Sequence, residues 1–142
     1  MSSTNYWRVT IEPEYATWET CRDQGIIVIG YDDSPDDFNV KRFRDEMKKG
    51  DKVVVFLKKG RVGALGTIVG DYSVDEVALG AVKWMWRTRK VEWNHRAVYG
   101  WDRKILYDKL SDNVKNALSG RDTVRQLSKT QYEEIEGLIL LR

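Results

Sequence analysis

The sequence predicts an α+β domain, in which a small, strongly curved sheet or barrel has helices at both ends. Short apolar runs bounded by glycine and proline, typical of strands, fill most of the first two thirds of the chain. Apolar residues at helical spacing dominate the last third. The chain shows no internal repeat, low-complexity tract or linker, so we treat residues 1–142 as a single domain.

The first predicted elements are a strand, a short helix and a buried strand. "NYWRVTIE", residues 5–12, alternates apolar with polar side chains, which predicts a strand with one apolar face. Proline suits a helix start, so the segment after Pro13, from Glu14 to Arg22, predicts a short helix. "GIIVIG", residues 25–30, is apolar between its glycines and predicts a buried strand.

An acidic loop leads into the second predicted helix. Ser34 can cap this helix, Pro35 can take its first position, and the acids of the loop favour its N-terminus. The helix is expected to run from about Asp36 to Lys49, and Gly50 ends it.

The middle of the chain predicts further strands. The expected elements are strand 52–58, turn 59–61, strand 62–70, a loop at 73–80, and strand-like segments at 81–87 and 89–95 that could form one long bent strand. The glycines at 60, 63, 66 and 70 are followed by a strand, whereas a phosphate-binding loop requires a helix. We therefore interpret them as turn and bend positions.

Helices are expected to close the domain. Apolar residues from Ile105 to Leu118 follow a helical period, and "SKTQ", from Ser128 to Gln131, resembles a capping box that opens a final helix. The barrel should thus occupy about residues 5–95 and the C-terminal helices about 103–141.

Several functional classes lack the residues they need. The chain has one histidine, His95, and one cysteine, Cys21, which excludes a Cys/His zinc site and a histidine-based triad within it. Cys21 has no partner for an internal disulfide, which fits a reducing, cytoplasmic location. No apolar run reaches the length of about 18 residues that spans a membrane, and the N-terminus is not a signal peptide. We expect no metal, cofactor or catalytic residue.

Charge is distributed unevenly along the chain. Residues 11–40 carry eight acids and one base, whereas residues 81–110 carry eight bases and three acids. A basic face of this kind can attract phosphates. Alternatively, the acidic and basic surfaces simply pair with each other.

The tryptophans give the most informative pattern. Trp7 and Trp93 share strand faces with apolar residues and are expected in the core, whereas Trp84 and Trp86 share a face beside cations, and Trp18 lies on a short helix. A barrel of this size buries two or three tryptophans, so the others could form a partly open pocket. A nucleobase can stack there while Arg and Lys hold its phosphates. Simple packing, membrane attachment and a protein interface remain alternatives.

The order of "NYWRVTIE", "YATWET", "GIIVIG", "GDKVVVFLKKGRVGALGTIVG" and "RKVEW" resembles the PUA-like superfamily, and EVE and YTH domains most of all, over about residues 5–95. The resemblance implies a curved β-barrel that binds nucleic acid, and in YTH domains an aromatic cage for a methylated adenine. By position, Trp18 resembles the first cage tryptophan, Trp84 or Trp86 the second, and Trp93 a structural one. The segment between the second cage position and "RKVEW" is short here.

The C-terminal "DTVRQLSKTQYEEIEGLILL" looks like the end of archaeal EVE-like domains. It also resembles the target-recognition domain of McrBC-type, modification-dependent restriction enzymes, which continue into a GTPase motor. This chain has no GxxxxGK[ST] motif, so the resemblance implies the recognition part alone, with a GTPase motor domain and a nuclease subunit as partners.

We therefore predict a non-catalytic module that binds nucleic acid, DNA in preference to RNA, and takes a flipped, methylated base into an aromatic pocket. The alternatives are an RNA-binding EVE/YTH-like reader, a small ASCH-like enzyme and a protein-interaction domain. The predicted base-binding residues are Trp18, Tyr31, Trp84 and Trp86, and the predicted phosphate-binding residues are Arg22, Arg87, Arg89, Lys90 and Arg96.

Overall fold

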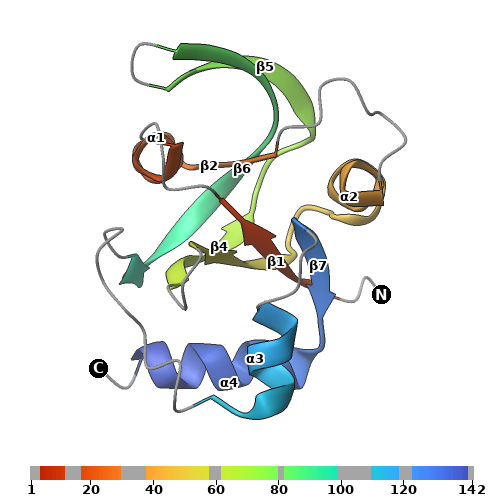
Figure 1. The fold of residues 1–142 in the computed structure, drawn as a ribbon, viewed down its shortest axis with the longest axis vertical. Coiled ribbons are helices and arrows are strands. Elements are labelled where there is room, and N and C mark those ends of the chain that lie inside the picture. Colours follow the sequence, from red (N-terminus) through yellow and green to blue (C-terminus); the bar gives the residue numbers. More distant parts are fainter. Residues whose placement is uncertain are drawn as a thin grey trace.

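The computed structural model is shown in Figure 1. It describes the backbone of residues 4–11, 17–29, 38–57, 62–79, 82–98, 110–118 and 123–140, and the side chains of the same residues except 17, 75–79, 82–86, 95–98 and 140. In this part of the chain, no helix combines the length and the apolar character needed to cross a membrane.

One curled, mixed sheet forms the centre of the domain and confirms the predicted fold class. Its strands follow the order β2-β6-β4-β3-β1-β7, and β5 also pairs with β6. The pairing of β1 with β3 is parallel, and the other pairings are antiparallel. The strands are β1 (Tyr6–Thr10), β2 (Ile26–Ile29), β3 (Lys52–Phe56), β4 (Val62–Ile68), β5 (Ser73–Leu79), β6 (Val82–Val98) and β7 (Val124–Leu127).

Strand β6 is one long strand, as the sequence suggested. Its first part pairs with β5 and its last part with β4, so β6 connects the part of the sheet formed with β2 and β5 to the part that continues through β4. At Arg87 and Thr88 it is paired on both sides, with β2 and with β5. Figure 1 shows β5 and the start of β6 arching above β2 and α1. The loop predicted at 73–80 is wrong, because this segment pairs with β6 and forms β5.

In the described part of the chain, two pairs of helices flank the sheet. They are α1 (Thr17–Gln24), α2 (Phe38–Lys41) continued by the π-helix η2 (Arg42–Glu46), α3 (Asp112–Leu118) and α4 (Lys129–Leu140). Figure 1 shows α1 and α2 on opposite sides of the strands, with α3 and α4 below them. The predicted capping box of α4 is confirmed: Ser128 Oγ accepts the Gln131 N–H at 3.1 Å, and Gln131 Oε1 accepts the Ser128 N–H at 2.9 Å.

The second helix ends at Glu46, earlier than the predicted Lys49. In an α-helix the carbonyls of Phe43 and Arg44 would accept the backbone N–H groups four residues further on. Here both carbonyls accept hydrogen bonds from the Arg89 guanidinium, and the Met47 N–H bonds back to Arg42 O at 2.9 Å. A side chain from β6 therefore replaces the next turn of the helix.

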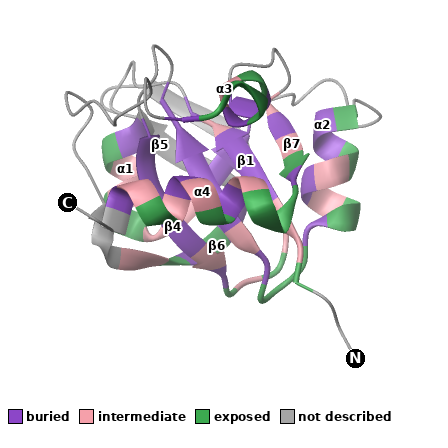
Figure 2. Cartoon of the chain, turned by 90° about the horizontal axis from the view of Figure 1, so that it is seen from below, coloured by how far each residue is buried: buried purple, intermediate pink, exposed green. Residues whose placement is uncertain are grey.

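The sheet buries both of its faces (Figure 2). One cluster includes Trp7, Val9 and Phe43, and a second lies between the other face and the helices α3 and α4. The sequence predicted only one apolar face for β1, but Arg8 on the opposite face is also fully buried. Its Nη1 donates to Leu118 O at 3.1 Å, at the end of α3. The C-terminal helices thus cover the second face of β1, which the alternation of apolar and polar residues predicted to be exposed to solvent.

Candidate functional site

Of the four predicted base-binding residues, Trp18 is the one whose side chain the structure describes. Its indole is fully buried and lies edge-on to Trp93, with ring centroids 5.4 Å apart and an interplanar angle of 76°. Gly63 makes room for it, because a Cβ atom at that position would lie 3.0 Å from Trp18 Cε2. The sequence predicted that Trp18 lines a partly open pocket, but its indole is enclosed in the structure. A base could stack on Trp18 only if the residues that cover the indole moved.

For the other three predicted base-binding residues, the structure does not describe the side chain. Tyr31 lies outside the described residues, and for Trp84 and Trp86 the backbone alone is described. Both belong to β6, where Trp84 pairs with Val77 and Trp86 pairs with Asp75 of β5.

The elements that carry the three tryptophans are neighbours. Helix α1, which carries Trp18, contacts both β2 and β5, and β5 pairs with the part of β6 that contains Trp84 and Trp86. Figure 1 shows α1 beneath the arch formed by β5 and β6. We call this region, formed by α1, β5 and residues 82–88 of β6, the arch site.

Trp7 lies in the core, as predicted, and Trp93 is partly buried and packs against the same cluster. Trp93 Nε1 donates to Arg22 O at 3.1 Å, which ties β6 to α1. Its ring packs on Gly66, where a Cβ atom would lie 2.8 Å from Trp93 Cε3. Trp7 is buried, and its Nε1 donates to the buried Asp51 carboxylate at 2.9 Å.

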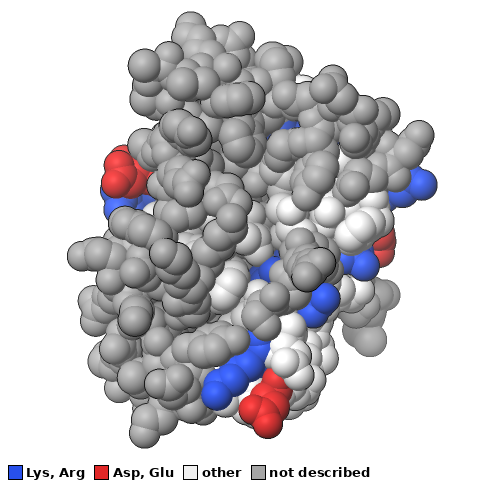
Figure 3. Space-filling model, viewed as in Figure 1, with Lys and Arg blue, Asp and Glu red and all other residues white. Residues whose placement is uncertain are grey.

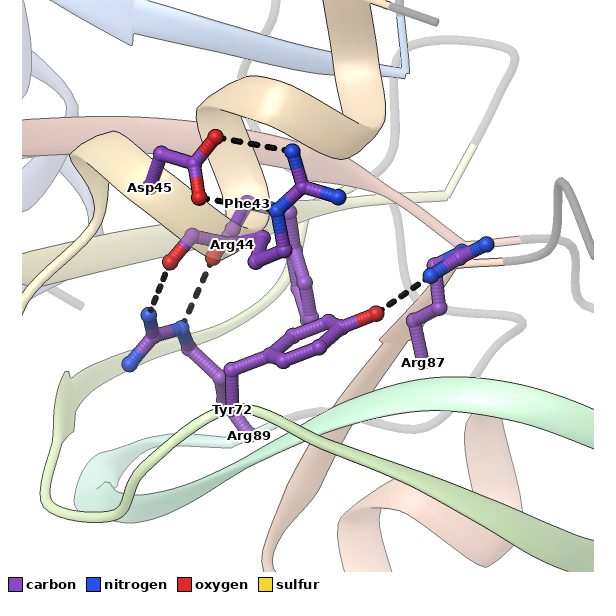
Figure 4. Close-up of polar contacts among 6 residues, drawn as sticks. All are labelled: Phe43, Arg44, Asp45, Tyr72, Arg87 and Arg89. Atoms are coloured by element: carbon purple, nitrogen blue, oxygen red, sulfur yellow. Dashed lines mark hydrogen bonds and ion pairs between the residues drawn. The ribbon is translucent and has the colours of Figure 1, made fainter. Parts of the chain in front are cut away.

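Arg89 does not lie where a phosphate-binding residue was expected. Its side chain is 5% exposed, and its guanidinium donates to Phe43 O at 2.8 Å and Arg44 O at 3.1 Å (Figure 4). It also donates to Gly70 O at 3.2 Å. Burial lowers the pKa of Arg89, while the charges of Asp71 and Asp51 oppose that shift. The described contacts make Arg89 a structural residue, which corrects the sequence-based expectation.

Arg87 is also buried, at 8% exposure, rather than presented to solvent. Its Nη1 donates to the Tyr72 hydroxyl (Figure 4). Tyr72 in turn lies edge-on to Phe43, with ring centroids 6.2 Å apart. Arg87 and Arg89 therefore both fasten the 70–72 segment to the corner of β6. The expected phosphate contact of Arg87 does not match this placement.

Two of the three remaining predicted phosphate-binding residues, Lys90 and Arg22, are more accessible. Lys90 is exposed, and Arg22 is partly exposed and forms an ion pair with Asp23 at 3.1 Å. The side chain of Arg96 lies outside the description. Figure 3 shows Lys and Arg side chains of the described residues interspersed with Asp and Glu on one face. Among the predicted phosphate-binding residues with described side chains, Lys90 and Arg22 are the ones accessible enough to contact a phosphate.

The described residues contain no group of three His, Cys, Asp or Glu side chains that could hold a metal ion. Cys21 is buried, as the sequence suggested, and burial raises the pKa of its thiol to about 12. A protonated, enclosed thiol is a packing residue rather than a nucleophile.

A concavity that no sequence pattern predicted lies between β4, β6 and α4. It is lined by Lys52, Thr67, Glu92, Trp93, Tyr132 and Glu136, among others, and has a volume of about 250 Å³. Its walls come from segments that are far apart in the chain, so local patterns cannot bring them together.

Solved structures that share this fold include YTH domains. The YTH domain of the Zygosaccharomyces rouxii MRB1 protein, in complex with N6-methyladenosine RNA, matches with a TM-score of 0.66 at 15% identity, covering 98% of this chain and 88% of that one. The Mmi1 YTH domain in complex with RNA matches with a TM-score of 0.60 at 14% identity, covering 96% and 77%. Protein Atu2648 from Agrobacterium tumefaciens matches with a TM-score of 0.60 at 19% identity, covering 96% and 93%.

At these identities the similarity establishes the fold. The expected resemblance to YTH domains is thus confirmed as a shared curled sheet with flanking helices. The resemblance to McrBC-type target-recognition domains stays a prediction. No curated protein matches the chain.

A family assignment completes the comparison. The matched segment, residues 36–128, runs from just before α2 to the residue that caps α4, and so includes β3 to β7. This chain belongs to the family described as "Domain of unknown function (DUF8426)".

Proposed function

We propose that this chain is a non-catalytic module that binds RNA and takes a modified base into the arch site. The observation that carries the proposal is the meeting of α1 with the β5–β6 arch, because it brings together the elements of Trp18, Trp84 and Trp86. Two of the structural neighbours with the same fold are complexes with RNA, and one of these RNAs contains N6-methyladenosine.

These neighbours favour RNA over the DNA expected from the sequence, because both complexes contain RNA. The physical chemistry agrees. Single-stranded RNA presents unstacked bases, so a base can reach a pocket without the cost of flipping it out of a duplex. A link to a restriction system, with GTPase and nuclease partners, has no support from these neighbours.

Stacking on aromatic side chains supplies the specific part of the binding energy. Each stacked base contributes on the order of 1–3 kcal/mol. Lys90 and Arg22, on the two elements joined by the Trp93–Arg22 hydrogen bond, are placed to add sequence-independent contacts to phosphate. Arg87 and Arg89 contribute indirectly, because they hold the corner of β6 in place.

The direct test is fluorescence-polarisation binding at two salt concentrations. The panel contains matched RNA and DNA oligonucleotides that are unmodified or carry N6-methyladenine, 5-methylcytosine or 5-hydroxymethylcytosine. We expect a modified RNA to bind most tightly. Equal affinity for every modified and unmodified oligonucleotide would contradict a base reader, and tighter binding of a modified DNA would restore the DNA alternative.

The variants Trp84→Ala and Trp86→Ala test the site itself. The variant that removes a pocket wall should bind modified RNA about 5- to 150-fold more weakly, corresponding to the loss of one stacking contact, and should keep the affinity for unmodified RNA. Thermal unfolding of each variant serves as the folding control. Trp18→Ala is a poorer first choice, because removing a buried indole costs about 3–5 kcal/mol of stability.

The absence of catalysis has its own test. Modified RNA incubated with the protein and then analysed by mass spectrometry should remain unchanged. Loss of the modification or cleavage of the strand would favour the enzyme alternative.

A further inference from the structure

Within the arch site, β5 and residues 82–88 of β6 form a two-stranded arm that extends beyond β2. Strand β2 pairs with β6 only as far as Arg87, whereas β5 continues to pair with β6 down to Val82. In the described pairings, residues 82–86 therefore have β5 as their partner. Two strands on their own are only marginally stable, so the orientation of the arm depends on the contacts at its base.

A side-chain hydrogen bond joins the two strands at the base of the arm. Arg87 Nη1 donates to the hydroxyl of Tyr72, the residue directly before β5. The Tyr72 ring lies edge-on to Phe43, a fully buried residue of η2. Figure 4 shows the Tyr72 hydroxyl directed at the Arg87 guanidinium. Tyr72 therefore connects the base of the arm to the core beside η2.

A second bond joins the same two strands next to the first. Ser73 and Thr88 are direct cross-strand partners, and their hydroxyl oxygens are 3.0 Å apart. Thr88 is buried and pairs on its other side with the buried Val28 of β2. Successive side chains of a strand point to opposite faces, so the bonds of Arg87 and Thr88 hold the base of the arm from both faces of the sheet.

The length of the arm makes its far end sensitive to these contacts. The seven residues of β5 span about 20 Å, so a tilt of about 10° at the base moves the far end by about 3–4 Å. Trp84 and Trp86 belong to the β6 strand of the arm, and Figure 1 shows α1, which carries Trp18, beneath it. A movement of this size is comparable with the thickness of a nucleobase and would decide whether a base fits between the arm and α1.

We propose that Tyr72 and Arg87 are positioning residues of the arch site, because their hydrogen bond sets the tilt of the arm over α1 and with it the space for a modified base. The role in base selection rests on the proposed function, whereas the role in arm orientation rests on the contacts at the base of the arm. Both groups suit this role: the guanidinium is planar, and the tyrosine ring is held by its packing against Phe43.

The orientation of the arm is measured first, on the full chain without RNA. A nitroxide label is attached to Glu19→Cys, at an exposed position of α1, and the broadening of backbone amide NMR signals is followed along residues 75–79 of β5. Cys21 does not compete for the label, because its thiol is buried and protonated.

The variant for this measurement is Tyr72→Phe, which keeps the ring against Phe43 and removes the hydroxyl. We expect the broadening along residues 75–79 to differ from that of the labelled wild type, because the arm takes another tilt. The amide signals of β1 and β3 should broaden as in the wild type. Thermal unfolding establishes that the variant is folded at the temperature of the measurement.

Tyr6→Phe is the matched control. Tyr6 is a partly buried tyrosine of β1 whose ring packs against Tyr132 of α4. Loss of its hydroxyl should leave the broadening of the arm unchanged. Arg87→Lys should change the same arm signals as Tyr72→Phe does. The double variant should add nothing beyond the larger single effect, because both substitutions remove one and the same bond.

Selectivity for the base is measured second. Tyr72→Phe should lower the ratio of the affinities for modified and unmodified RNA about fivefold, the equivalent of one hydrogen bond. The affinity for unmodified RNA should stay unchanged. A merely structural role of Tyr72 would instead lower the melting temperature and weaken the binding of both RNAs together.

Three results would overturn the positioning role. The first is equal broadening of residues 75–79 in the wild type, Tyr72→Phe and Arg87→Lys. The second is an additive effect in the double variant. The third is an unchanged affinity ratio in Tyr72→Phe when the wild type is selective. A wild type that prefers no modified base would contradict the proposed function instead, and the amide broadening would still decide whether Tyr72 and Arg87 orient the arm.

Discussion

Arg89 Nε donates to the carbonyl oxygen of Phe43 at a distance of 2.8 Å, across 46 residues of sequence. The same guanidinium also bonds to the carbonyls of Arg44 and Gly70. One side chain therefore ends the π-helix η2 and fixes the corner where β6 passes from one part of the curled sheet to the other. π-Helical turns are rare and are found mostly as single turns inserted in α-helices. Here the carbonyls of Phe43 and Arg44, at the end of the turn, accept hydrogen bonds from Arg89.

Replacement of Arg89 tests this structural role. Arg89→Lys keeps the charge but cannot donate to three carbonyls in the planar geometry of the guanidinium. We expect the free energy of unfolding to fall by about 2–4 kcal/mol, because buried carbonyls lose charge-assisted hydrogen bonds. Urea denaturation measures this loss. A variant as stable as the wild type, with weaker RNA binding, would instead indicate that Arg89 contacts phosphate.

Lys90, the neighbour of Arg89, should behave in the opposite way. It is exposed, so Lys90→Ala should change the free energy of unfolding by no more than about 0.5 kcal/mol. If Lys90 contacts a phosphate, the variant should weaken modified and unmodified RNA equally. It should also reduce the slope of log affinity against log salt by about 0.7. An unchanged slope would remove Lys90 from the interface.

Two glycines form a matched pair for stability. Gly66→Ala places a Cβ atom 2.8 Å from Trp93 Cε3 and 3.1 Å from Glu92 O, so either the ring or the sheet must shift. We expect a loss of about 1–3 kcal/mol from this overpacking. Gly137→Ala, in the interior of α4, has no atom within 4 Å of its new Cβ and should stabilise by about 0.5–1 kcal/mol. Equal effects of the two substitutions on the melting temperature would contradict the close packing at Gly66.

The buried thiol of Cys21 should make the free energy of unfolding decrease at alkaline pH. Burial raises the pKa of the folded thiol from 9.0 to about 12, so the folded state holds this proton over a range in which the unfolded state releases it. The contribution is complete below pH 9 and is lost as the pH rises toward 12. The wild type should therefore lose up to about 1.4 kcal/mol per pH unit above pH 9 relative to Cys21→Ala. Urea denaturation of both proteins at pH 8, 9 and 10.5 measures the difference, and parallel pH profiles would contradict it.

Sequence analysis predicted correctly those elements whose signal lies within their own residues. The apolar runs of β2 and β3 and the Ser128–Gln131 capping box appear where the sequence placed them. β5, "SVDEVAL", was missed, because its strand conformation depends on pairing with β6 rather than on its own alternation. The end of η2 was missed for a similar reason, since Arg89, far along the chain, supplies the bonds that stop it.

In the candidate site too, the sequence predicted residues whose placement depends on near neighbours and missed those whose partners are distant in the chain. Residue types predicted Trp7 and Trp93 as core, because both share a strand face with apolar neighbours; Trp7 is buried, and Trp93 is partly buried against the same cluster. The same reasoning assigned Arg87 and Arg89 to the surface, because cations are seldom buried. Their partners are a tyrosine hydroxyl and backbone carbonyls, which leave no mark in the spacing of charged residues. Burial of a cation by carbonyl groups can be recognised only once the fold is known.

The position of β1 between β3 and β7 sets an order of events during synthesis on the ribosome. Tyr6 to Val9 pair with Leu127 to Val124, so one edge of β1 has no partner until residues near 127 have left the exit tunnel. At translation rates of about 5–20 residues per second, that edge waits for several seconds. During this interval the nascent chain exposes an unpaired strand edge. Other chains can pair with this edge, and molecular chaperones can bind it.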